Sequence, residues 1–303
     1  MAEVKRTDLA LEAKECMKEK GELKDVLFEQ KEDPMNGIKI SRVQIETEAA
    51  GRQLGKKKGT YITIEGNEKD SFLNKGTQKR IVQELEKLAG GQKQKKILVV
   101  GLGNREITPD ALGPLTIDQI EVTRHLFREF GDVVKRWGYQ TNVEAIAPGV
   151  MAQTGMEMVE IIQGIIEQTK PETVITIDAL ATRSVKRLFR TVQITDSGIS
   201  PGAGVGNRRC SIDKETLGIP VIAMGVPTVV DSRTILEEAI EDLFQGGNEK
   251  EKQFMEQFHN FRLEDMENMF MTDKEVDQQI KNMSSLLAKV LNEYGINTGK
   301  DKK

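Results

Sequence analysis

The sequence predicts an α/β fold, a three-layer α/β/α sandwich around a mainly parallel, mixed sheet. Apolar runs that are typical of buried strands alternate along the chain with segments whose apolar residues recur at helical spacing. At 303 residues the chain is long enough for one large domain of this class. No apolar run reaches about 18 residues, the length that spans a membrane, so we expect no membrane segment.

The N-terminal part differs from the rest of the chain. Residues 1–35 are highly charged and have too few apolar positions for a core helix, which predicts a mobile or regulatory arm. In the region 36–66, apolar residues such as Ile38 and Ile40, then Ile62 and Ile64, alternate with polar ones. This period of two predicts a hairpin-like pair of strands, inserted ahead of the main sheet.

From residue 77 onward, predicted helices and strands alternate. Glycine pairs end two of the helices, and Thr-x-x-Glu or Thr-x-x-Gln spacings open three of them. The expected elements are a helix at 77–89, a strand at 96–100, a helix from Pro114 to near Gly131, a strand at 143–148, a helix at 158–166, strands at 173–178, 191–195 and 219–225, a helix from Thr234 to Leu243, and a last helix from Thr272 to Leu291 within a helical tail region at 248–303.

Two of these strands lead into a carboxylate. The run from Val99 to Asn104 continues to Asp110, and the strand at 173–178 ends at Asp178. Neighbouring parallel strands would bring both aspartates to the edge where open α/β sheets carry their sites. Two carboxylates held close do not both ionise easily, so the pair could activate a water as acid and base. The alternative is that each aspartate only caps a helix or a turn.

Composition excludes several other classes of function. The 44 basic and 48 acidic side chains give a formal net charge of −4, without the broad basic field that binds nucleic acid. The two cysteines form no C-x-x-C pair, which indicates a reduced, cytoplasmic setting. Neither of the two histidines lies in a pattern typical of a zinc site or a catalytic triad. Glu106 replaces the third glycine of a dinucleotide loop, so we expect no cofactor.

A second glycine-rich stretch, 196–209, follows the Asp178 strand. Its backbone amides, with Gly202 and Gly204 among them, could stabilise an oxyanion, although the stretch could equally be a surface loop. Arginines near the same edge could bind an acidic side chain of a substrate, or form ordinary surface ion pairs. These arginines are Arg183, Arg187, Arg208 and Arg209.

Four motifs in a fixed order resemble the germination protease family of endospore-forming bacteria. The resemblance extends from Arg6 to about Asp231 and leaves the C-terminal part uncovered. The motifs are Val100-Gly-Leu-Gly-Asn continuing to Thr108-Pro-Asp-Ala-Leu-Gly-Pro114, Ala147-Pro-Gly-Val-Met-Ala-Gln-Thr-Gly155, Ile177-Asp-Ala-Leu-Ala-Thr-Arg-Ser184 and Gly198-Ile-Ser-Pro-Gly-Ala-Gly-Val-Gly-Asn207.

The resemblance implies an atypical aspartic endopeptidase, a hydrolase that degrades small acid-soluble spore proteins in the spore core during germination. It implies Asp110 and Asp178 as the catalytic pair, a homotetramer, and a fold similar to that of hydrogenase-maturation peptidases. Those peptidases hold nickel with a histidine that the glycine-rich stretch here lacks, so no metal is expected. Two alternatives are kept: a metal-dependent peptidase with the same two aspartates as ligands, and a non-enzymatic binding protein.

The resemblance also implies a zymogen, because members of this family remove a short leader by self-cleavage after an acidic residue. The segment Thr7-Asp-Leu-Ala10 is close to the family's target, with aspartate in place of glutamate. We therefore expect cleavage between Asp8 and Leu9, which makes residues 1–8 a propeptide and 9–303 a single peptidase domain. Thr47-Glu-Ala-Ala50 matches the target in part, and burial in the strand-rich region is expected to protect it.

Overall fold

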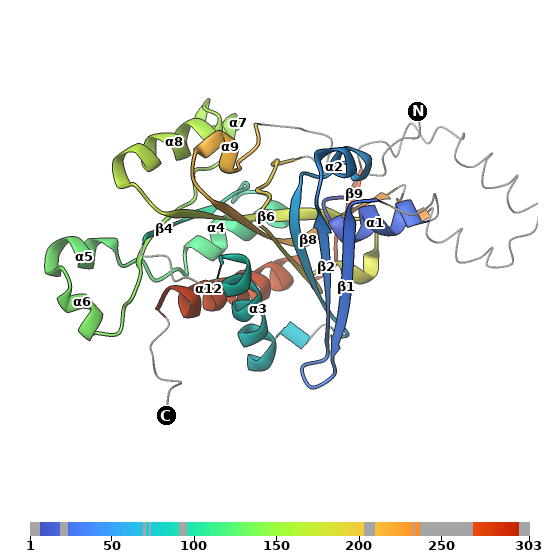
Figure 1. The fold of residues 1–303 in the computed structure, drawn as a ribbon, viewed down its shortest axis with the longest axis horizontal. Coiled ribbons are helices and arrows are strands. Elements are labelled where there is room, and N and C mark those ends of the chain that lie inside the picture. The colour runs from blue at the N-terminus through green and yellow to red at the C-terminus, as the bar shows by residue number, and fades with distance from the viewer. Residues whose placement is uncertain are drawn as a thin grey trace, which may run out of the picture.

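The computed structural model describes residues 7–18, 24–68, 71–72, 74–90, 96–202, 210–232, 234–236 and 269–296. Within these residues, nine strands form one mixed sheet (Figure 1). The strands are β1 (Val26–Asp33), β2 (Ile38–Ile45), β3 (Gly59–Gly66), β4 (Lys96–Gly101), β5 (Asn142–Ile146), β6 (Thr173–Thr182), β7 (Thr191–Thr195), β8 (Val221–Asp231) and β9 (Phe270–Met271).

The order across the sheet is β1-β2-β3-β7-β8-β6-β4-β5, with β9 paired to β8. The four strands β8, β6, β4 and β5 are parallel, whereas each pairing from β8 through β7, β3 and β2 to β1 is antiparallel. The sheet is therefore mixed, as the sequence predicts, and its parallel part is confined to one half.

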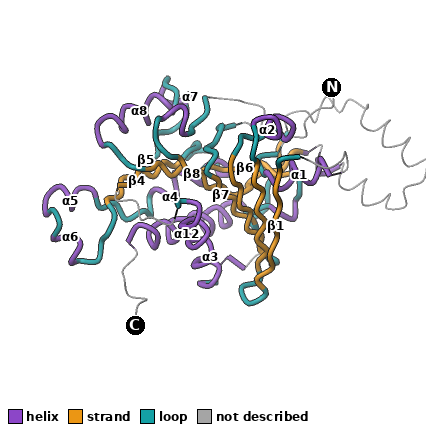
Figure 2. Tube along the Cα trace, viewed as in Figure 1, coloured by secondary structure: helices purple, strands orange, loops and turns teal. Residues whose placement is uncertain are grey.

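Helices cover both faces of the sheet (Figures 1 and 2). In β4, Ile97 and Val99 pack into a core with α3, α4 and α12, while Leu98 and Val100 pack into a second core with α8 and α9. A third core joins α1 and α2 to β2 and β3. The helices are α1 (Ala10–Lys18), α2 (Glu48–Leu54), α3 (Lys75–Leu88), α4 (Leu112–Ile117), α5 (Arg124–Phe130), α6 (Val133–Arg136), α7 (Met151–Thr154), α8 (Met158–Thr169), α9 (Lys214–Leu217) and α12 (Val276–Ile296), with short 3-10 helices η2 (Thr108–Asp110) and η3 (Val185–Arg187).

The expectation of a mobile arm at residues 1–35 is wrong wherever the structure describes this segment. Leu9, Ala10 and Leu11 are fully buried at the start of α1, and β1 pairs with β2 along its whole length. The apolar residues are few because α1 buries only a short stretch and because β1 is an edge strand with mostly exposed side chains.

The predicted hairpin-like pair is confirmed, because β2 and β3 are antiparallel neighbours. Between them lies α2, which the sequence did not predict. Thr47 caps this helix by accepting a hydrogen bond from the Ala50 amide at 3.2 Å, so Thr47–Ala50 is a helix start and not part of a strand. Glu48 and Ala49 are exposed, which contradicts the expected burial of this target-like segment.

The helix predicted from Pro114 to Gly131 is broken into α4 and α5. Thr123 explains the break, because its buried hydroxyl donates to the Thr141 carbonyl at 2.7 Å and accepts from the Val143 amide at 2.8 Å. These bonds tie the chain to the start of β5. The last predicted helix is confirmed as α12, whereas most of the helix predicted from Thr234 and the stretch 248–268 lie outside the described residues. Among the described helices, none has the length and apolar character needed to cross a membrane.

Candidate active site

Three glycines fold the chain tightly after β4 and thereby position Asp110. A Cβ at Gly101 would lie 2.4 Å from the Gly113 carbonyl oxygen. A Cβ at Gly103, whose φ is +110°, would lie 2.1 Å from the Asp110 carbonyl oxygen. The Asn104 amide donates to Oδ2 of Asp110 at 2.7 Å and fixes the carboxylate. The glycines therefore let the backbone turn tightly between β4 and Asp110.

Alanine at Gly113 should disturb this loop. The added Cβ would lie 2.3 Å from the Leu102 carbonyl oxygen, so we expect a loss of about 1–3 kcal/mol in the free energy of unfolding, measured in urea. Gly164→Ala in α8 is the matched control, because nothing lies within 4 Å of its Cβ and alanine favours a helix by about 0.5–1 kcal/mol. Equal stability of the two variants would contradict the close contact between Gly113 and the backbone of Leu102.

Asp178 lies beside the end of β4, in the middle of β6. The Leu102 amide, just after β4, donates to the carbonyl oxygen of Ile177 at 2.8 Å. Asp178 is the next residue of β6. Asp178 is buried, and its Oδ1 accepts from the Ala179 amide at 3.0 Å. The prediction that the strand ends at Asp178 is wrong: β6 continues to Thr182, because β8 pairs with it throughout that stretch.

The structure brings the elements that carry the two aspartates together. The 3-10 helix η2, which ends at Asp110, contacts both β6 and β8. Each carboxylate also accepts a hydrogen bond from a backbone amide of its own segment. Such a bond is what the alternative interpretation, that each aspartate only caps a helix or a turn, expects. Within the described part of the chain, no three His, Cys, Asp or Glu side chains are grouped so that they could hold a metal ion.

The predicted cleavage site lies against the part of β6 that extends beyond its pairing with β4. The Asp8 amide donates to the Ala181 carbonyl oxygen at 3.0 Å, and the Ala181 amide donates to Oδ2 of Asp8 at 2.9 Å. Asp8 therefore binds three residues beyond Asp178 on the same strand. Leu9 and Ala10, which follow it, are fully buried.

Lys56 holds the residue before Asp8. Its Nζ donates to the Thr7 carbonyl oxygen at 2.9 Å. Burial lowers the pKa of Lys56, and the negative charges of Asp8 and Glu12 oppose that shift. An acidic side chain at position 8 thus compensates a partly desolvated cation.

Gln193, which the sequence analysis did not single out, contacts the predicted cleavage segment. Its Nε2 donates to the Asp8 carbonyl oxygen at 3.2 Å, and its Oε1 accepts from the Ala10 amide at 2.9 Å. In the sequence, Gln193 stands between Val192 and Ile194, where an alternating strand presents a polar residue to solvent. In the structure it is only 6% exposed, because residues 8–10 lie against it.

Arg187 binds carboxylates of this chain. Its guanidinium contacts Glu12 at 3.0 Å, Glu15 at 2.9 Å and Glu65 at 2.7 Å. Burial alone would lower the pKa of Arg187, but the bond to Glu15 and the charges of Glu65 and Glu12 outweigh it and raise the pKa. Arg187 thus ties α1 to β3 and η3.

The other predicted substrate-binding residues fall into two groups. Arg183 also contacts α1: its backbone amide donates to Glu12 at 2.9 Å, and its guanidinium contacts Sγ of Cys16. Gly202 is described, with a positive φ of 73°. Gly204, Arg208 and Arg209 lie outside the described residues.

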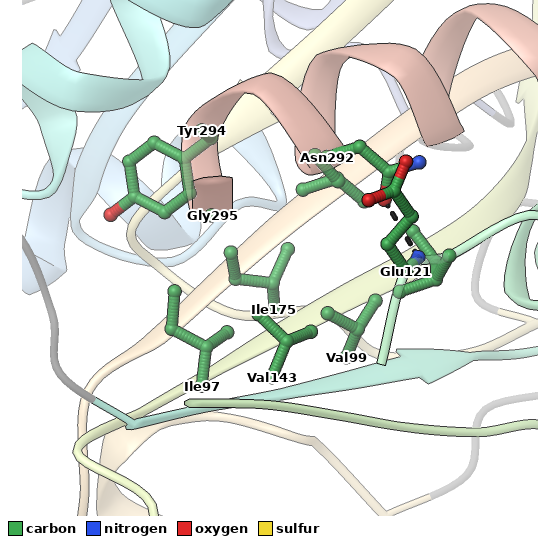
Figure 3. Close-up of a pocket in the computed structure, with 10 residues that line it drawn as sticks. Ile97, Val99, Glu121, Val143, Ile175, Asn292, Tyr294 and Gly295 are labelled. Carbon is green, nitrogen blue, oxygen red and sulfur yellow. Dashed lines mark hydrogen bonds between the residues drawn. The ribbon is translucent and has the colours of Figure 1, made fainter. Parts of the chain in front are cut away.

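A cavity beneath the end of α12 is lined mainly by apolar side chains, among them Ile97, Val99 and Val143 (Figure 3). Its volume of about 10 Å³ is close to the smallest space that holds one water molecule. Ile97 and Val99 belong to the face of β4 that packs on α12, and the cavity is too small for a peptide. It is not the substrate site.

Comparisons with known proteins show the family of this chain. The family model described as germination protease matches residues 3–259. The germination protease of Caldanaerobacter subterraneus subsp. tengcongensis is 43% identical over 309 residues, which cover 95% of this chain and 93% of the relative. That of Halalkalibacterium halodurans is 47% identical over 249 residues, which cover 78% of this chain and 66% of the relative.

Among solved structures, the [NiFe] hydrogenase maturation protease HycI from Thermococcus kodakarensis KOD1 is similar with a TM-score of 0.34 and 16% identity. The match covers 69% of this chain and 98% of that chain. The family model spans most of the sequence, and a relative above 40% identity covers nearly all of it. The chain therefore belongs to the germination protease family, and it is a peptidase.

Proposed function

We propose that this chain is the zymogen of an aspartic-type endopeptidase that begins the degradation of small acid-soluble spore proteins during germination. It cuts after an acidic residue, acts in the spore core and assembles as a homotetramer. Its first substrate is its own N-terminus, where cleavage of the Asp8–Leu9 bond removes residues 1–8 and leaves the peptidase domain 9–303. The observation that carries the proposal is the binding of Asp8 to Ala181, three residues beyond Asp178.

Asp110 and Asp178 act together on one water molecule. The ionised carboxylate accepts a proton from the water, and the oxygen attacks the carbonyl carbon of the residue before the scissile bond. The protonated carboxylic acid then supplies the proton that the departing amine needs. The reaction consumes one water and yields a new carboxylate and a new amino group.

Preference for an acidic residue follows from the contacts of Asp8. Its carboxylate accepts a hydrogen bond from the Ala181 amide. Its negative charge also favours the charged form of Lys56. Glutamate in the same place has the same charge and a longer reach. Arg183 and Arg187 hold α1 against the sheet in the uncleaved chain.

Self-cleavage tests the proposal directly. Purified full-length protein, incubated at mildly acidic pH, should acquire Leu9 as its new amino terminus, which N-terminal sequencing and intact mass detect. Asp178→Asn, treated in the same way, should keep residues 1–8. A wild-type chain that neither cuts itself nor degrades an added small acid-soluble spore protein would contradict the proposed function.

A further inference from the structure

Gln193 and Asp178 lie in one row across the sheet. Gln193 of β7 pairs with Gly225 of β8, and Gly225 pairs with Asp178 of β6. Directly paired residues present their side chains on the same face of a sheet. Two strand spacings separate the outer members of the row, so their Cα atoms are about 10 Å apart. Gly225, between them, contributes no side chain, and the Leu180 side chain packs over it, since a Cβ at Gly225 would lie 2.5 Å from Cγ of Leu180.

Residues 8–10 lie against Gln193, at one end of this row. One amide side chain, that of Gln193, makes a hydrogen bond on each side of Leu9: Nε2 donates to the Asp8 carbonyl oxygen at 3.2 Å and Oε1 accepts from the Ala10 amide at 2.9 Å. The Asp8 amide is bound to β6 through Ala181. The segment thus bridges β6 and β7, and the carbonyl of the predicted scissile bond points at Gln193.

We propose that Gln193 is a catalytic residue that stabilises the oxyanion formed at the scissile carbonyl. The inference rests on the proposed function and deepens it. When water adds to the carbonyl carbon of Asp8, the carbonyl oxygen gains a negative charge, and the Nε2–H bond to that oxygen strengthens. When the C–N bond breaks, the carbonyl reforms, Leu9 takes the proton, and Gln193 is unchanged.

The position of Gln193 suits this role. The side chain is buried, so the donor acts on the carbonyl with little competition from solvent water. The second bond, from the Ala10 amide, fixes the orientation of the amide group, because only its oxygen can accept that hydrogen. Gln193 thereby supplies a donor of the kind that the sequence assigned to the backbone amides of 196–209.

Gln193→Glu separates the two bonds. The carboxylate still accepts the Ala10 amide but, when ionised, offers no hydrogen to the Asp8 carbonyl. Gln193→Met fills a similar volume and makes neither bond, so it serves as the second variant. Gln163→Glu is the matched control, since Gln163 donates to the Thr216 carbonyl oxygen at 3.0 Å on an exposed part of α8.

Two readouts on the full-length chain distinguish catalysis from docking. Mass spectrometry follows the rate at which Leu9 becomes the amino terminus, and hydrogen exchange at the Ala10 amide reports whether the segment stays bound. We expect Gln193→Glu to retain protection of Ala10 and to cleave about 10²–10³-fold more slowly, while Gln163→Glu cleaves at the wild-type rate. Gln193→Met should be at least as slow.

Two results would overturn the inference. One is wild-type cleavage by Gln193→Glu or by folded Gln193→Met. The other is loss of Ala10 protection in both variants together with loss of cleavage, which would make Gln193 a docking residue only. Failure of the proposed function looks different, because the wild-type chain itself would then leave Asp8–Leu9 intact.

Discussion

Replacement of Asp178 by asparagine is expected to abolish cleavage at Asp8–Leu9 while leaving the fold intact. Asparagine has the same size and still offers an oxygen to the Ala179 amide, which Asp178 accepts at 3.0 Å. It cannot accept and return a proton, so the rate should fall by about 10³-fold or more. Mass spectrometry of the incubated chain measures the rate, and circular dichroism checks the fold.

Asp110→Asn should have the same effect, because an amide oxygen can still accept the Asn104 amide and hold the loop. The matched control is Asp118→Asn, which changes an exposed aspartate a few residues further along the same connection. Asp118 is 48% exposed and pairs with Arg105 at 2.6 Å, away from the predicted chemistry. Wild-type cleavage by either Asp110→Asn or Asp178→Asn would dismiss the catalytic pair.

Arg187→Met is expected to destabilise the uncleaved chain by about 3 kcal/mol, because it removes the partner of a buried charge. Glu12 is 2% exposed and would lose the guanidinium, while the Thr7 and Thr182 hydroxyls and the Arg183 amide remain as its donors. Glu65 would lose its bond at 2.7 Å. The free energy of unfolding in urea measures the loss.

Arg105→Met provides the matched control for this prediction. Arg105 also pairs with a carboxylate, Asp118, but the two side chains are 46% and 48% exposed. Exposed pairs contribute about 0–1 kcal/mol, so Arg105→Met should lie close to the wild type. If the two arginine variants lose the same stability, the contacts of Arg187 with α1 and β3 do not hold the fold as the structure indicates.

The parallel half of the fold could be predicted from the sequence because three of its strands, β4, β6 and β8, are buried on both faces. Such strands appear in the sequence as continuous apolar runs, as at 96–100. In the helices that cover them, apolar residues recur at helical spacing. The location of Asp110 after a glycine-rich turn was equally predictable, since the turn is local.

Elements that depend on partners elsewhere were missed or misplaced. The break before α5 depends on hydrogen bonds from Thr123 to β5, and the extension of β6 beyond Asp178 depends on β8. The start of α1 is buried only because the sheet lies beneath it, so its short apolar stretch gave no period to detect.

By itself, the sequence determined the α/β class and singled out Asp110, Asp178 and the target-like segment at residues 7–10, because strand periodicity, turn chemistry and short motifs are properties of neighbouring residues. Only the tertiary structure decided that Asp8 binds Ala181 and that Gln193 binds the Asp8 carbonyl. These bonds join segments more than 170 positions apart, and a hydrogen bond over that separation leaves no pattern in either segment.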